Sequence, residues 1–110
     1  MLLPPDTRIA TEKLTDYLLV RQYRGDKSEF LALAGYRLEN YAVLLHDLRT
    51  QILTVEANPT DNNEYGQMYE IIGNLHGPNG TVLRVRTIWM TEHLTGTTKF
   101  ITLIPEKRQE

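Results

Sequence analysis

The 110-residue sequence contains no cysteine. This absence excludes disulfides, thiol catalysis, iron–sulfur clusters and cysteine-ligated zinc, and it favours a reducing cytoplasm because small secreted folds usually need such cross-links. No apolar stretch approaches the roughly 20 residues that a membrane span requires, and the chain start lacks the charged and long apolar regions of a signal peptide. We therefore expect a cytoplasmic protein with no membrane-bound part.

An excess of positive charge is also missing, because the formal net charge is −2. Binding to nucleic acid or anionic lipid would need a local basic patch. Hydrophobic residues make up 41% and charged residues 24% of the chain, which is ordinary for a folded protein. The length is typical of one domain, so we expect a single domain over 1–110 with an irregular arm over 1–9 and a frayed tail over 106–110.

The first half of the chain has helical periodicity. A helix of two or three turns is predicted from Thr11, and a second from Lys27 to about Ala34, with Asp26 as its N-cap and Gly35 as its left-handed C-terminal residue. The strongest helical pattern follows Asn40, which we expect to be a cap. Its apolar positions are Tyr41, Leu44, Leu45, Leu48 and Ile52.

After Gly66 the apolar period becomes two, which is typical of strands. Residues 58–63 are turn-forming and separate the two halves. The pattern predicts an α+β fold, with about three N-terminal helices packed on one face of a C-terminal antiparallel sheet of three to four strands. The expected strands cover 67–75, 81–90 and 99–104, with 53–57 as a short fourth.

The first two of these strands form a predicted hairpin around residues 76–80. Its two-residue turn is either Asn79-Gly80 or Pro78-Asn79. Both registers place Glu70 near Thr87 on one face, a pairing more typical of ordinary cross-strand contact than of catalysis. On the other face both place apolar residues that include Tyr69, Ile71, Ile88 and Met90 beside Arg84 and Arg86.

Few residues have a spacing that indicates chemistry. His46, His76 and His93 are not spaced like metal ligands, so we interpret them as surface residues and predict neither a metal nor a cofactor. Arg84 and Arg86 lie on one strand face about 7 Å apart, which suits adjacent phosphates. Pairing with carboxylates on an exposed strand is the more ordinary role.

Another local basic cluster lies between the first two helices. It contains Arg21, Arg24 and Lys27, interleaved with Tyr23, and such a cluster can hold a phosphate backbone with a base stacked on the tyrosine. Nearby acidic residues dilute its charge, which favours a solvated loop. Trp89 is expected in the core.

Four segments together resemble an uncharacterised bacterial domain family, over nearly the whole chain. They are Lys13–Leu19, Gly77–Gly80, Val85–Trp89 and Phe100–Pro105. Members of that family are similar to small domains at the C-termini of bacterial polymorphic toxins, whose sheets resemble those of barnase-like and RelE-like ribonucleases. The resemblance implies Lys27, Arg86, Thr87 and Thr102 as catalytic residues. Many relatives carry an NPxHPxG segment where this chain reads Val20–Gly25, so the family's histidine, a proton-transfer group, is missing.

Two hypotheses follow for the function. The first is a non-catalytic module that binds a protein, a second copy or a small ligand, through Arg84, Arg86, Tyr69 and Ile88 and the apolar patch that the hairpin places around them. The second is a toxin-type RNA-cleaving domain, in which a ribose 2′-hydroxyl attacks the adjacent phosphate and arginines stabilise the developing charge.

Overall fold

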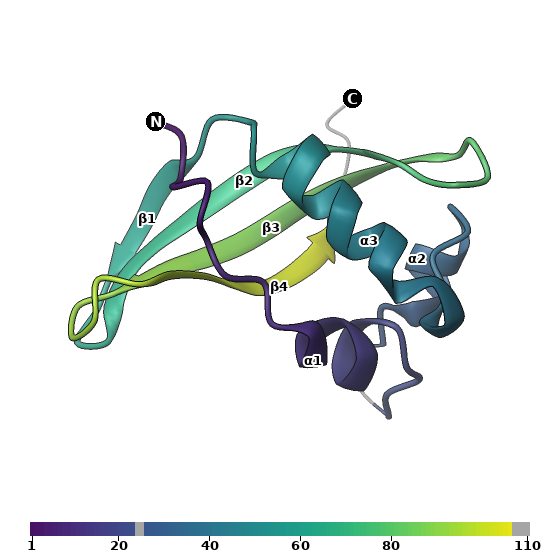
Figure 1. Cartoon of the computed structure of the whole chain (residues 1–110), viewed down its shortest axis with the longest axis horizontal. Coiled ribbons are helices and arrows are strands. Elements are labelled where there is room, and N and C mark those ends of the chain that lie inside the picture. Colours follow the sequence, from purple (N-terminus) through teal and green to yellow (C-terminus); the bar gives the residue numbers. More distant parts are fainter. Residues whose placement is uncertain (24–25, 107–110) are drawn as a thin grey trace.

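A computed structural model describes residues 1–23 and 26–106. It has the expected α+β architecture, with helices on one face of a four-stranded antiparallel sheet of order β1-β2-β3-β4 (Figure 1). The helices are α1 (Thr11–Lys13), continued by a π-helical turn over Leu14–Leu18, then α2 (Ser28–Ala32) and α3 (Tyr41–Asp47), continued by a π-helical turn over Leu48–Ile52. The strands are β1 (Asn58–Asn62), β2 (Gly66–His76), β3 (Val82–Glu92) and β4 (Thr98–Pro105).

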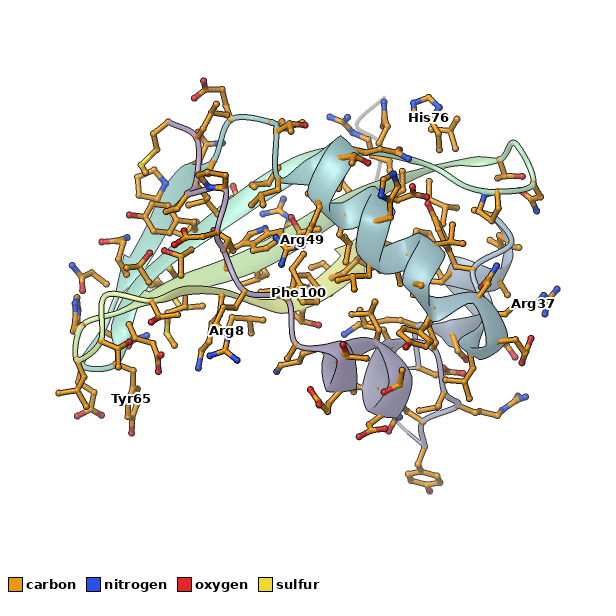
Figure 2. The ribbon with its side chains drawn as sticks, in the orientation of Figure 1. Arg8, Arg37, Arg49, Tyr65, His76 and Phe100 are labelled. Carbon is orange, nitrogen blue, oxygen red and sulfur yellow. The ribbon has the colours of Figure 1, made fainter. Side chains whose placement is uncertain are left out.

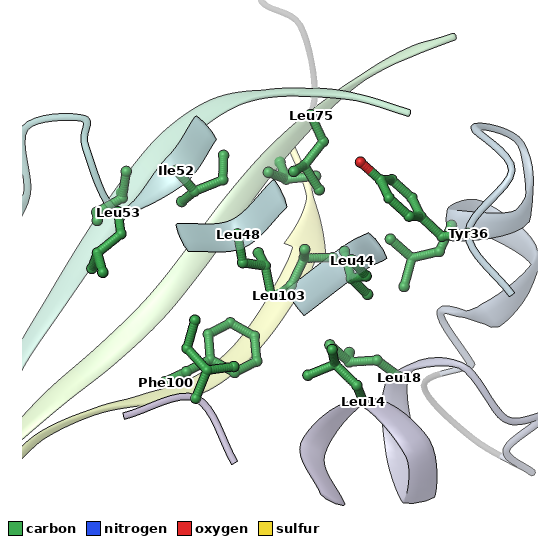
Figure 3. Packing of buried hydrophobic residues seen from close by; sticks show 14 of the residues in the cluster. Leu14, Leu18, Tyr36, Leu44, Leu48, Ile52, Leu53, Leu75, Phe100 and Leu103 are labelled. Atoms are coloured by element: carbon green, nitrogen blue, oxygen red, sulfur yellow. The ribbon is translucent and has the colours of Figure 1, made fainter. Parts of the chain in front are cut away.

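Most of the predicted apolar positions lie in the core between the helices and the sheet, but Tyr41, predicted as part of the third-helix stripe, is exposed. Leu44, Leu48 and Ile52 are fully buried where α3 and its extension cross the sheet. Leu14 and Leu18, on the π-helical turn after α1, are fully buried on the core side of that turn (Figure 3). Each such side chain contributes about 1.5–3 kcal/mol of transfer free energy. None of the helices in the described ranges has the length and apolar character needed to cross a membrane.

The helix ends differ partly from the prediction. Gly35 has a φ of +91°, as expected after α2. The Asp26 carboxylate accepts the Ser28 backbone N–H at 2.9 Å, but the N-cap position of α2 is Lys27, one residue after the predicted cap. The Asn40 side chain does not cap α3. A 3-10 turn over Leu38–Asn40 precedes this helix, so the Asn40 amide instead bonds the turn, through the Arg37 N–H at 2.7 Å and the Gly35 carbonyl at 3.0 Å.

The β2–β3 hairpin has a three-residue loop, so the predicted two-residue turn is wrong. His76 pairs with Val82, and the Gly77 N–H bonds the Thr81 carbonyl at 2.9 Å. Gly80 has a φ of +90°, the left-handed position that closes a three-residue loop. The extra loop residue shifts the cross-strand pairing by one. Each residue of β2 therefore pairs with a β3 residue that was predicted to lie on the opposite face of the hairpin.

This shift rearranges both faces of the sheet. Ile71 pairs with Thr87 on the face that the helices cover, and Glu70 pairs with Ile88 on the opposite face, which we call the open face. The predicted contact between Glu70 and Thr87 is therefore wrong. The predicted patch is wrong as well, because Ile71 is fully buried under the helices while Ile88 and Met90 lie on the open face.

The remaining strand prediction also needs correction. Residues 58–62, predicted as turn, form the edge strand β1, whose residues are all exposed. Pairing with β2 satisfies backbone groups whatever the side chains, and an edge position tolerates Pro59. Residues 53–57 do not form a strand, because the chain leaves the helix through a turn in which the Val55 N–H bonds the Ile52 carbonyl at 2.9 Å.

The N-terminal arm is irregular and packs along β4. Arg8 bridges to this edge strand, with its N–H on the Thr98 carbonyl at 2.9 Å and its carbonyl accepting the Phe100 N–H at 2.8 Å (Figure 2). Leu3 and Ile9 are buried. The arm thereby places α1 beside the later part of β4. Of the predicted frayed tail, residues 107–110 lie outside the described residues.

Candidate ligand site at the edge of β4

A pocket of about 550 Å³ lies between the first helix and the edge strand β4. Three of its polar side chains come from segments distant in the sequence: Tyr17 from the π-helical turn, Lys27 from the residue before α2, and Thr102 from β4. The other lining residues are Ala10, Glu12, Lys13 and Ile101. The fold thus brings together Lys27 and Thr102, two of the four residues that the resemblance implies.

Lys27 is the centre of this cluster. Its Nζ donates to the Tyr17 hydroxyl at 2.8 Å and to the Thr102 hydroxyl at 3.4 Å, and it lies 5.0 Å from the centroid of the Tyr17 ring. An ammonium group has three protons and no acceptor. Tyr17 therefore accepts from Lys27 and keeps its own proton available, and one Lys27 N–H remains for another acceptor. We call Lys27 and Tyr17 the donor pair.

The hydrogen bond from Lys27 also changes the acidity of its partner. It lowers the pKa of the Tyr17 phenol, with a smaller contribution from Thr102, against the opposing effect of burial. A cation next to the phenol stabilises the phenolate form. Tyr17 is consequently a stronger hydrogen-bond donor than an isolated tyrosine, and it ionises at lower pH.

The charge of Lys27 is not compensated by an acidic neighbour. Within residues 1–23 and 26–106, no carboxylate lies within ion-pair distance of its Nζ. Glu12 lines the same pocket without pairing with Lys27. The half-buried ammonium group is therefore available to a negatively charged ligand.

Arg86, the other charged residue that the resemblance implies, is already occupied. Its guanidinium pairs with Glu70 on β2 and binds both oxygens of Glu106, at 3.2 Å from Nε and 3.1 Å from Nη2. Arg84 lies on the same open face, as predicted, and donates to the Asn74 side chain at 3.3 Å. The sequence suggested two roles for this arginine pair, binding of adjacent phosphates and pairing with carboxylates, and Arg86 has the second.

Thr87 lies on the opposite side of the sheet from these charges. It is fully buried, donates to the Ile71 carbonyl at 2.9 Å and accepts the Trp89 indole N–H at 2.7 Å. Trp89 is fully buried, as predicted. Tyr69, another predicted binding residue, is partly buried against the core, whereas Ile88 lies opposite Thr102 on the open face.

The other candidate groups are dispersed. Figure 2 shows His76 and Tyr65 at opposite ends of the sheet, and His93 lies at the Tyr65 end, where its N–H bonds the Tyr65 carbonyl at 3.0 Å. No group of three potential metal ligands occurs in the described part of the chain. In the predicted basic cluster, Arg21 pairs with Glu29 at 3.2 Å, and Arg24 lies outside the described residues.

Sequence reasoning did not identify Tyr17 as a functional residue. Its spacing with Leu14 and Leu18 marked it only as part of an apolar helical face. The phenol ring does cover part of the core, while the hydroxyl reaches Lys27 ten residues later. Amphipathic side chains such as tyrosine commonly combine these two roles, and no local sequence signal separates them.

Comparison with known proteins identifies a family but no activity. A family model described as Domain of unknown function (DUF6883) matches residues 5–107. No curated protein and no solved structure matches the chain.

Proposed function

The chain belongs to this family of unknown function, and we propose from its geometry that it is a binding module for an anionic ligand, held by Lys27 and Tyr17. The observation that carries the proposal is the uncompensated Lys27 ammonium group, aligned by two hydroxyls at the wall of a pocket. Hydrogen bonds to charged groups contribute about 1.5–3 kcal/mol each. The donor pair therefore favours a carboxylate or phosphate over a neutral molecule.

Titration of the isotopically labelled protein with inorganic phosphate tests this function. We expect backbone amide signals around Ile101 and Thr102 to shift, and the Lys27→Met variant to lose at least tenfold in affinity. Lys99→Met is the matched control, because it removes the same charge from a lysine that pairs with Glu92 at 3.3 Å outside the pocket. Equal phosphate affinity in the wild-type and Lys27→Met proteins, or no binding at all, would contradict the proposal.

RNA cleavage is the second candidate function, and the lowered pKa of Tyr17 favours it. In this mechanism the Tyr17 phenolate takes the proton of a ribose 2′-hydroxyl, the 2′-oxygen attacks the adjacent phosphorus, and the 5′-oxygen leaves with a proton from water. Lys27 stabilises the charge on the phosphate oxygens. Tyr17 would thus supply a proton-transfer group in place of the histidine that the resemblance implies and this chain lacks.

Incubation with mixed RNA distinguishes this candidate from simple binding. Cleavage is expected for the wild-type protein and for Arg86→Ala, because Arg86 is held by two carboxylates, and a loss of at least a hundredfold is expected for Tyr17→Phe. Absence of cleavage by the wild-type protein, or equal cleavage by Tyr17→Phe, removes the enzymatic candidate. Neither result affects the binding proposal.

A further inference from the structure

The pocket beside the donor pair has mostly apolar walls. Ala10, Ile101 and Tyr17 line it together with the polar or charged residues Glu12, Lys13, Lys27 and Thr102. Its volume of about 550 Å³ lies within the range of small-molecule sites. A lone phosphate or carboxylate would leave most of this space unfilled, so the surface is suited to a ligand that also has an apolar part.

On the β3 side of the pocket, the charged cluster around Arg86 disfavours a ligand with several negative groups. Thr102 pairs with Ile88, and Ile104 pairs with Arg86 two residues further along the same face. This places Arg86 diagonally from Thr102, at a spacing of about 7–8 Å between diagonal neighbours. Arg86 faces two carboxylates, those of Glu70 and Glu106, so this neighbouring cluster has an excess of one negative charge. A second phosphate of an oligonucleotide would meet repulsion there.

We propose that the pocket binds a small amphiphilic molecule, whose single anionic group contacts Lys27 and Tyr17 and whose apolar body packs against Ala10 and Ile101. The inference rests on the proposed binding function and narrows its ligand class. It also assigns Ile101, the extra residue at the β4 register shift between the Trp89–Phe100 and Ile88–Thr102 pairs, as the residue that sets the preference for the apolar body.

A series of straight-chain carboxylates tests the ligand class by calorimetry. Acetate, butanoate and hexanoate keep one charge and differ only in apolar length. Each CH₂ group that becomes buried is expected to tighten binding by about three- to fourfold. A hexauridylate RNA serves as the polyanionic comparison, and we expect it to bind more weakly than hexanoate.

Two variants separate the anionic group from the apolar body. Ile101→Thr keeps the β-branched shape suited to a strand and is expected to reduce the gain in affinity per CH₂ group, so that hexanoate loses more affinity than acetate. Lys27→Met is expected to weaken all three carboxylates together by at least tenfold. Tyr17→Phe, which leaves the lysine in place, provides a second test of the donor pair and is expected to weaken them by about threefold or more.

The possible results distinguish the amphiphilic ligand class from the anion-binding function on which it rests. Lys27-dependent binding with the same affinity for acetate and hexanoate, or tighter binding of the RNA, would overturn the amphiphilic ligand class and leave the anion-binding function intact. Binding of none of these compounds and none of inorganic phosphate would overturn both. A length dependence that Ile101→Thr does not change would remove Ile101 from the site.

Discussion

The hydroxyl of Tyr36 donates a 2.7 Å hydrogen bond to Oδ2 of Asp47, and both side chains are buried. The same hydroxyl lies 3.4 Å from the His76 carbonyl. The contact connects the segment after α2 with the last turn of α3 and the end of β2. A carboxylate is tolerated at such a depth because it has a hydrogen-bond donor.

Removing this donor should destabilise the domain. In Tyr36→Phe the ring packing is retained but the Asp47 carboxylate loses its partner, so we expect the free energy of unfolding to fall by about 1–3 kcal/mol. Urea unfolding followed by tryptophan fluorescence measures the change. Tyr65→Phe, at a position 69% exposed, is the control and should change stability by less than about 0.5 kcal/mol. Equal losses in the two variants would contradict this role of the hydrogen bond.

Tyr36 should also make the stability of the domain depend on pH in the alkaline range. Burial, and then the neighbouring Asp47, raise the pKa of Tyr36 far above its ordinary value. In the unfolded chain Tyr36 ionises near pH ~10, whereas in the folded protein it stays protonated. Its contribution to stability is therefore complete below about pH 10 and is lost as the pH rises further. Between pH 8 and pH 11, Tyr36→Phe should lose less stability than the wild-type protein, and parallel losses would refute the assignment.

Thr87 should matter for stability and not for ligand binding. Thr87→Val leaves the buried Trp89 indole N–H without its acceptor, which we expect to cost about 1–3 kcal/mol in urea unfolding. Because Thr87 faces the helices, phosphate affinity of the folded variant should equal that of the wild-type protein. Thr102→Val is the matched comparison on β4 and should show the reverse, weaker phosphate binding with a smaller loss of stability. A loss of affinity in Thr87→Val alone would contradict this division.

The acidity of Tyr17 should depend on Lys27. In Lys27→Met the hydrogen bond that chiefly lowers the pKa of Tyr17 is absent, so this pKa should rise toward its ordinary value of about 10. Nuclear magnetic resonance of ¹³Cζ-labelled tyrosine follows the titration, and Tyr17→Phe identifies the signal. Lys99→Met should leave the Tyr17 titration unchanged. An unchanged pKa in Lys27→Met would exclude the proposed hydrogen bond.

Local periodicity predicted the elements that pack through one continuous face. The α3 stripe and the alternation along β2 and β3 depend on which side chains of one segment are apolar, and burial follows directly from that pattern. The same reasoning could not predict β1, because its five exposed residues are held by pairing with β2. Nor could it locate the donor pair, since Tyr17 on the π-helical turn after α1 and Lys27 before α2 meet only in the tertiary structure, beside Thr102 of β4.

Sequence alone determined the fold class and the two halves of the chain, because composition and apolar period are properties of neighbouring residues. The tertiary structure decided the hairpin register. The hairpin loop packs against the end of α2, where the Asn79 side-chain amide bonds the Leu33 carbonyl at 3.0 Å and a Cβ on Gly77 would lie 2.2 Å from the Ala34 oxygen. That contact accompanies a three-residue loop, and the register that results decides which side chains share a face.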